Sequence, residues 1–131
     1  MAKAPVKNDQ PLVSVAPSGE AFPLPTPADY KKEFNRLKRL VAKHRKEGRE
    51  IVVVMGVGFV GAVMAGVVAD SPNKFVIGMQ RPSPRSYWKI PLLNRGIAPV
   101  ESEDPEVAPL IARCVLEKKT LTATFTYDAL S

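Results

Sequence analysis

Three glycines follow an apolar run at the spacing G-x-G-x-x-G. The run extends from Ile51 to Met55, and the glycines are Gly56, Gly58 and Gly61. The first glycine of such a motif permits a tight turn, the second leaves room for phosphates to approach main-chain N–H groups, and the third lets the next helix pack closely on the strand. The N-terminus of that helix adds the positive end of its dipole. The spacing therefore predicts a strand, a dinucleotide-binding turn and a helix.

The same stretch has a second interpretation, because residues 51–69 contain no charged residue. Their number is close to the roughly 20 residues of a membrane-spanning helix. A basic flank precedes them, as in a cytoplasmic anchor: Lys43, Arg45, Lys46 and Arg49. However, four glycines would weaken a lipid-exposed helix, and the β-branched residues cluster before Gly56. These features favour a strand followed by a helix, and no membrane partner is expected.

A second strand is predicted after the helix. The helix is expected to end at about Asp70, where Ser71-Pro72 interrupts it. Lys74–Met79 is nearly all apolar, which is typical of a strand buried in a parallel sheet. Strand, helix and strand together form a right-handed βαβ unit.

Gln80 and Arg81 follow this second strand, where an acidic residue usually binds the adenosine ribose. A neutral amide can still hydrogen-bond a hydroxyl, whereas an arginine can pair with a 2′-phosphate. The two residues leave the choice between NAD and NADP open. They also allow the simpler interpretation of a polar strand end without a ligand.

The rest of the chain is predicted to supply further helices and one more strand. The proline-rich residues 81–88 predict a loop, and residues 89–96 predict a short helical turn closed by Gly96. A longer helix is expected to begin between residues 104 and 109 and to end at 118 or 119. Cys114 lies on its apolar face and is expected to be a buried, unreactive thiol.

Leu121–Tyr127 is rich in β-branched and aromatic residues and predicts a third parallel strand. Residues 49–131 therefore predict an α/β fold, the first half of a Rossmann-type doubly wound parallel sheet. An open edge on the third strand would be a liability. It implies marginal stability, a homo-oligomer, a partner chain that covers the edge, or a missing remainder.

The formal net charge of +6 arises in the N-terminal part of the chain. Residues 1–49 hold 11 Lys/Arg and five Asp/Glu, whereas residues 50–131 hold eight of each. Residues 1–27 contain six of the 13 prolines and predict a disordered leader. Residues 28–48 predict a basic amphipathic helix that docks through an apolar stripe, formed by Tyr30, Phe34, Leu37, Val41 and His44.

The composition also bears on whether the chain binds nucleic acid or metal ions, and on the cellular compartment in which it works. A basic helix with no platform of base-stacking aromatics does not favour nucleic acid. His44 is the lone histidine, and no metal site is expected. One cysteine excludes an intramolecular disulfide, and the polar N-terminus lacks the apolar core of a signal peptide, which favours the cytoplasm.

Taken in order, these segments resemble the N-terminal NAD-binding domain of the UDP-glucose/GDP-mannose dehydrogenase family. The turn from Gly56 to Gly61 is similar to the family's G-x-G-aromatic-Val-Gly form. Leu121–Thr124 is similar to its L-x-x-T pattern. Between them, a third match resembles its K-I-x-x-L-N-x-G-x-x-P-I-x-E segment: Lys89-Ile90, Leu93-Asn94, Gly96, Pro99-Val100 and Glu101.

The resemblance implies an oxidoreductase that converts the C6 alcohol of a nucleotide sugar to a carboxylate with NAD as acceptor. The family's nucleophilic cysteine and assisting lysine would lie beyond residue 131, so no catalytic residue is expected here. The expected cofactor-binding residues are Gly56, Val57, Gly58, Phe59, Val60, Gly61, Gln80, Arg81 and Thr124. Two positions depart from the family: Gln80 replaces an Asp, and Phe125-Thr126 replaces Thr-Asp.

Two functions therefore stand side by side. The chain is either the cofactor-binding front part of a nucleotide-sugar dehydrogenase, as a fragment or as one part of a split enzyme, or a non-catalytic nucleotide-binding or interaction module.

Overall fold

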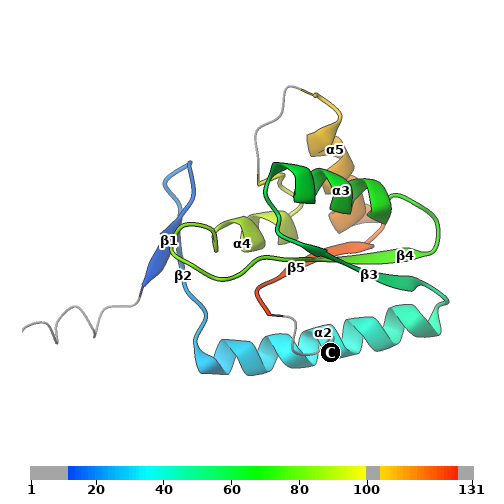
Figure 1. Ribbon diagram of the computed structural model, residues 1–131, viewed down its shortest axis with the longest axis horizontal. Coiled ribbons are helices and arrows are strands. Elements are labelled where there is room, and N and C mark those ends of the chain that lie inside the picture. The colour runs from blue at the N-terminus through cyan, green and yellow to red at the C-terminus, as the bar shows by residue number, and fades with distance from the viewer. Residues whose placement is uncertain (1–11, 100–103, 127–131) are drawn as a thin grey trace, which may run out of the picture.

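A parallel three-stranded sheet lies between two layers of helices in the computed structural model (Figure 1). The structure describes residues 12–99 and 104–126, apart from the side chain of Phe59. The elements in chain order are β1 (Val13–Val15), β2 (Ala21–Pro23), α2 (Pro27–Lys46), β3 (Glu50–Met55), α3 (Phe59–Ala69), β4 (Lys74–Met79), α4 (Lys89–Asn94), α5 (Val107–Ala112), the π-helical turn η1 (Arg113–Glu117) and β5 (Leu121–Thr124).

The sheet has the order β3-β4-β5, and both pairs are parallel. Val52 pairs with Val76, which in turn pairs with Leu121. Helices α3, α4 and α5 cover one face, and α2 covers the other (Figure 1). This arrangement confirms the predicted α/β fold, the first half of a Rossmann-type sheet preceded by an amphipathic basic helix.

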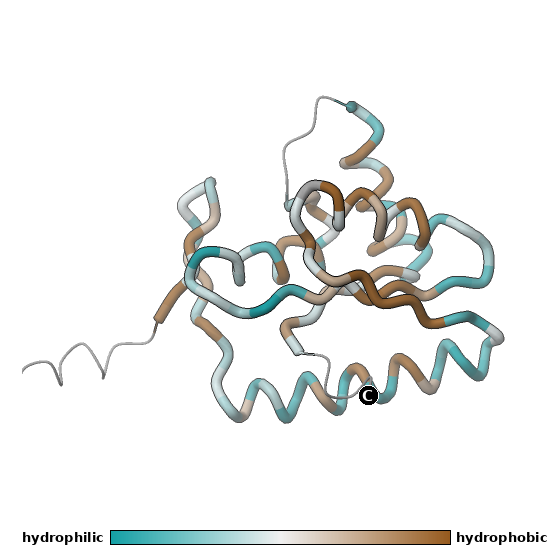
Figure 2. Tube along the Cα trace, in the orientation of Figure 1, coloured by the Kyte–Doolittle hydropathy of each residue, from teal (hydrophilic) through white to brown (hydrophobic). Residues whose placement is uncertain are grey.

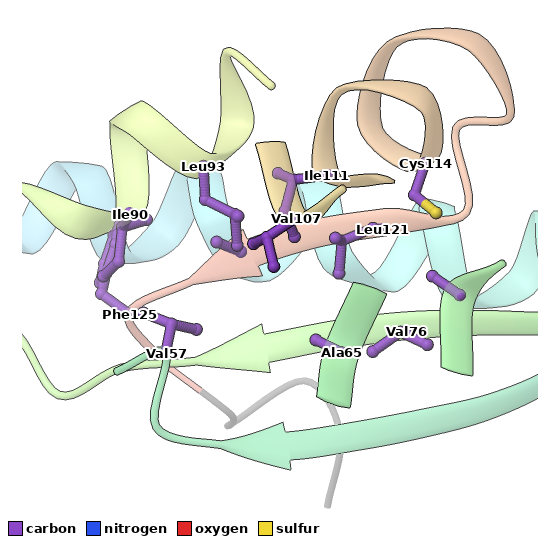
Figure 3. Close-up of a cluster of buried hydrophobic side chains, with 12 residues drawn as sticks. Val57, Ala65, Val76, Ile90, Leu93, Val107, Ile111, Cys114, Leu121 and Phe125 are labelled. Carbon is purple, nitrogen blue, oxygen red and sulfur yellow. The ribbon is translucent and has the colours of Figure 1, made fainter. Parts of the chain in front are cut away.

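The main core lies between the sheet and the α3 side. Its buried members include Val57, Ala65, Val76, Ile111 and Leu121 (Figure 3). A side chain at Gly66 would meet Leu110 at 3.0 Å, so this glycine lets α3 and α5 approach each other closely.

Cys114 belongs to the same core and is fully buried. Its thiol faces the Gly66 carbonyl oxygen at 3.5 Å, and burial raises the pKa of the thiol. The predicted burial of Cys114 is confirmed by this placement, and the raised pKa of the thiol agrees with the predicted lack of reactivity. The helix that carries it differs from the expectation in one respect, because its second half widens into η1.

Helix α2 docks through the C-terminal part of its apolar stripe. Leu37 and Val41 pack with Phe75 and Ile77 of β4 in a second buried cluster. Thr26 caps the helix: its hydroxyl accepts the Asp29 N–H at 3.3 Å, and the Asp29 carboxylate accepts the Thr26 N–H at 2.9 Å. The stripe is only partly covered at its other end, where Tyr30 and Phe34 are 37% and 38% exposed. Elsewhere the helix is mostly hydrophilic (Figure 2).

His44 closes this second cluster in its neutral form. The ring stacks on Phe75 with centroids 3.8 Å apart, and its Nδ1 lies 3.0 Å from the Arg49 guanidinium, which can only donate. Burial and then the charge of Arg49 lower the pKa of His44 from its ordinary value of 6.5; Glu47 opposes them, and Lys43 adds the smallest lowering effect. Protonation would place a second cation beside Arg49 in a buried position.

We expect the folded chain to lose stability as the pH falls from about 7 to 5. The pKa of His44 is lower in the folded than in the unfolded chain, so the unfolded chain binds the proton first. The contribution is complete above pH 6.5 and is lost as the pH falls through the folded pKa. Urea unfolding at pH 7, 6 and 5 measures this slope. In His44→Gln, which cannot titrate, the slope should become much smaller over this range, with a remainder near pH 5 from carboxylates such as Glu20 and Glu50 whose pKa is also lowered. An unchanged slope would assign it to these other groups.

A short hairpin corrects the expectation of a disordered leader. Residues 13–23 hold the antiparallel pair β1–β2, and residues 1–11 lie outside the described part. The Ser14 hydroxyl accepts the Trp88 N–H at 2.9 Å, and Glu20 pairs with Arg95 at 2.9 Å. The prediction failed because the hairpin is stabilised by residues some 75 positions away, which proline content cannot reveal.

The edge strands also differ from expectation, because side chains cover part of the β5 edge. The Asn94 amide oxygen accepts the Ala123 N–H at 2.8 Å, and its NH₂ group donates to the Ala123 carbonyl at 3.0 Å. Arg36 donates to the same carbonyl at 2.9 Å. The opposite edge is β3, which pairs only with β4 among the described elements, and its Met55 is 65% exposed. The strand itself ends at Thr124, and Tyr127 lies outside the described residues.

Candidate functional site

The glycine motif forms a tight turn between β3 and α3. Gly56 has φ of 92°, a left-handed value that side chains rarely tolerate, and its N–H donates to the Met79 carbonyl at 2.6 Å. A Cβ atom on Gly61 would collide with the Gly56 carbonyl, lying 2.9 Å from its carbon and closer still to its oxygen. The structure therefore requires the first glycine for conformation and the third for close packing.

The side-chain position of the middle glycine is open. Gly58 is the N-cap of α3, and a Cβ atom built there would meet nothing within 4 Å. The first intrahelical hydrogen bond runs from the Ala62 N–H to the Gly58 carbonyl at 2.8 Å. The N–H groups of the first turn, from Phe59 to Gly61, thus have no partner within the helix.

Nothing in the first turn neutralises the positive end of α3. No side chain caps the helix, and its first turn contains no acidic residue. Val60 at the second helical position is 65% exposed, so the turn is accessible from solvent. The N-terminus of α3 thus has backbone N–H groups without an intrahelical partner, no nearby carboxylate in its first turn, and a glycine with open space beside it. These are the features of a binding site for a phosphate group.

Gln80 lies beside this turn, although 23 residues separate it from Val57. Its side-chain oxygen accepts the Val57 N–H at 3.1 Å, and its NH₂ group is 3.4 Å from the Ser86 hydroxyl. Arg81 follows and is exposed. The structure therefore brings both residues to the carboxyl end of the sheet next to the glycine turn. It also ties the Gln80 oxygen to the turn, a contact that the motif did not predict.

Thr124 points to a different neighbour. It ends β5 opposite Met79, and its hydroxyl donates to the Glu33 carboxylate at 2.6 Å. Glu33 also binds Arg36 through two hydrogen bonds of 2.8 Å. The hydroxyl is thus engaged with α2, and no contact joins it to the glycine turn among the described residues. A role for Thr124 in binding the cofactor stays a prediction.

Residues 51–69 form a strand, a turn and a helix of 11 residues. Over the described residues, no helix has the length and apolar character needed to cross a bilayer. Within those same residues, no cluster of three His, Cys, Asp or Glu side chains is placed to hold a metal ion. A groove of about 440 Å³ between α3 and α5 is lined by Val67, Asp70 and Arg113 among others, away from the glycine turn.

The structure is similar to that of NDP-N-acetyl-D-galactosaminuronic acid dehydrogenase from Methanosarcina mazei Go1. The two share 30% sequence identity with a TM-score of 0.56, over 72% of this chain and 19% of that chain. The chain thus spans about a fifth of the length of this neighbour. No protein-family model and no curated protein sequence matches it.

Proposed function

We propose that this chain, which resembles the nucleotide-sugar dehydrogenases in sequence and in fold, is the cofactor-binding front part of such an oxidoreductase. The observation that carries the proposal is the turn from Gly56 to Gly61. Its middle glycine, Gly58, has open space at its side-chain position and begins α3, whose first turn contains no acidic residue. By the same resemblance, the complete enzyme would be of the UDP-glucose/GDP-mannose type. It would oxidise the C6 alcohol of a nucleotide sugar with NAD as acceptor. The cytoplasm is proposed as its compartment from the single cysteine and the polar N-terminal sequence.

The residues of the turn fit the diphosphate of a nicotinamide dinucleotide. Main-chain N–H groups from Gly58 to Gly61 would donate to the phosphate oxygens, because the α3 dipole favours negative charge there, whereas the Val57 N–H is bonded to Gln80. Gly58 would allow the close approach, since a methyl group would occupy the open space that the structure leaves above it. The adenosine ribose would lie by Gln80, at the carboxyl end of β4.

The hydride chemistry itself belongs to the nicotinamide ring of the bound cofactor. This chain would hold the ADP half of that molecule and orient it. No residue in the described part is proposed as a catalytic acid, base or nucleophile. Binding of the nucleotide sugar is proposed to need segments that correspond to the rest of the neighbour's length.

Calorimetric titration of the 131-residue chain with NADH and with NADPH tests the proposal. We expect at least one of them to bind, with a dissociation constant on the order of 10 μM to 1 mM, because half of the fold forms only part of the contacts. Adenosine at the same concentration serves as a control without phosphates and should bind far more weakly. A folded chain, judged by circular dichroism, that binds neither dinucleotide would contradict the proposal.

A further inference from the structure

The loop after β4 is basic and contains no acidic residue. Residues 80–89 include Arg81, Arg85 and Lys89, together with the hydroxyls of Ser83 and Ser86. The loop starts at the carboxyl end of β4, next to the glycine turn. In dinucleotide folds this is where the adenosine ribose lies. Its charge therefore bears on which ribose the site accepts.

Gln80 takes the place where a carboxylate normally binds the 2′-hydroxyl of the ribose. Its oxygen is used on the Val57 N–H at 3.1 Å, and its NH₂ group is directed to Ser86 at 3.4 Å. A carboxylate here would repel a phosphate on the 2′-oxygen. Gln80 removes that repulsion, because the amide is neutral.

The loop is folded so that its two hydroxyls lie together. The Ser83 and Ser86 oxygens are 2.7 Å apart, and the Ser86 hydroxyl donates to the Arg81 carbonyl at 3.1 Å. The Trp88 indole N–H donates to the Arg85 carbonyl at 2.9 Å. Both hydroxyl hydrogens are thus used within the loop, Ser86 donating to Arg81 and Ser83 to Ser86. These contacts hold the backbone of Arg81 in place, and Gln80 connects the loop to the glycine turn.

The two loop arginines are available for a ligand. Arg81 and Arg85 are exposed, and neither forms an ion pair with a described residue. By contrast, Arg36, Arg49, Arg95 and Arg113 all pair with carboxylates. A guanidinium presents a fork of donors that matches two phosphate oxygens at once.

We propose that Arg81 binds a phosphate on the 2′-oxygen of the adenosine ribose, so that the chain takes a 2′-phosphorylated dinucleotide (NADP) in preference to NAD. This inference rests on the proposed function and concerns the same site. It departs from the NAD use that the family resemblance implies, and the reason is the replacement of the expected acid by Gln80-Arg81. Arg85 supplies a second positive charge to the same loop.

The test compares two ligands that differ only in this phosphate: ADP-ribose and 2′-phospho-ADP-ribose, titrated into the full chain by calorimetry. We expect the phosphorylated ligand to bind about 10- to 100-fold more tightly, as a charge-assisted arginine contact gives. In Arg81→Ala this preference should largely disappear, while the affinity for ADP-ribose changes less than about threefold. Circular dichroism verifies that the variant is folded.

Arg39→Ala is the matched control, because it removes the same charge from the exposed surface of α2. It should leave the affinities for both ligands unchanged. This result would show that the preference comes from a local contact of Arg81 and not from the overall positive charge of the chain. Equal or tighter binding of ADP-ribose, or a preference that survives Arg81→Ala, overturns this inference and leaves the proposed function standing. Binding of neither ligand overturns both.

Discussion

Replacing Gly61 with alanine should destabilise the chain by about 3 kcal/mol and remove dinucleotide binding. The added methyl group would overlap the Gly56 carbonyl oxygen and lie 2.9 Å from its carbon. Both are backbone atoms, so no side-chain rotation relieves the overlap. Either α3 must move away from β3 or the turn must change shape, and both displace the N–H groups proposed to hold the phosphates. Urea unfolding followed by circular dichroism measures the first effect, and calorimetric titration with NADH and NADPH measures the second.

Gly58→Ala is the matched control, since it adds the same methyl group three residues before Gly61, at a position without crowding. Nothing lies within 4 Å of its Cβ position, and φ at Gly58 is −69°, which alanine adopts readily. Its cost in stability should stay below about 1 kcal/mol, the penalty of alanine at an N-cap. Dinucleotide affinity should nevertheless fall at least about tenfold, because the methyl group fills the phosphate space. If Gly58→Ala binds as the parent chain does, the turn is structural and the proposed site is wrong.

Replacing Phe75 with alanine should lower the free energy of unfolding by about 3 to 5 kcal/mol. The ring is 1% exposed and packs between the His44 ring and the Leu37–Val41 stripe of α2. Its removal leaves a cavity that the sheet cannot close, because β4 is the central strand and is paired on both edges. Since small domains have only about 5 to 15 kcal/mol of stability, this variant should unfold at far lower urea concentration.

Phe34→Ala is the control for Phe75→Ala, because it removes a phenylalanine side chain from the exposed part of α2. That ring is 38% exposed, and Lys38 stands 5.9 Å above it. We expect a cost of about 1 kcal/mol or less, since exposed substitutions rarely exceed this. Equal losses for the two variants would show that α2 does not dock on β4 through the Leu37–Val41 stripe.

The turn and the sheet could be predicted because their determinants are local. Positive φ at Gly56 and the overlap at Gly61 are properties of a strand that reverses into a helix, so the glycine spacing records them directly. The nearly all-apolar Lys74–Met79 likewise reflects burial on both faces of β4. Helix α2 could be predicted as well, since its cap and stripe follow the helical period.

The roles of single polar residues could not be predicted in this way. Asn94 was part of a family match, yet its function in covering the β5 edge depends on Ala123, 29 residues later. Thr124 is predicted to lie near the cofactor, and the motif did not reveal that its hydroxyl is bonded to Glu33, 91 residues earlier. A spacing rule describes one segment at a time, whereas these contacts require two segments to be packed first.

The sequence by itself therefore determined that residues 51–79 form a strand, a glycine turn, a helix and a strand, since steric limits and apolar periodicity act within a few residues. Only the tertiary structure decided that α2 covers the second face of the sheet, that residues 13–23 form a docked hairpin, and that the Gln80 oxygen binds the glycine turn. Those outcomes depend on which buried surfaces and hydrogen-bonding groups meet once the chain is folded, and such pairings carry no fixed spacing along the chain.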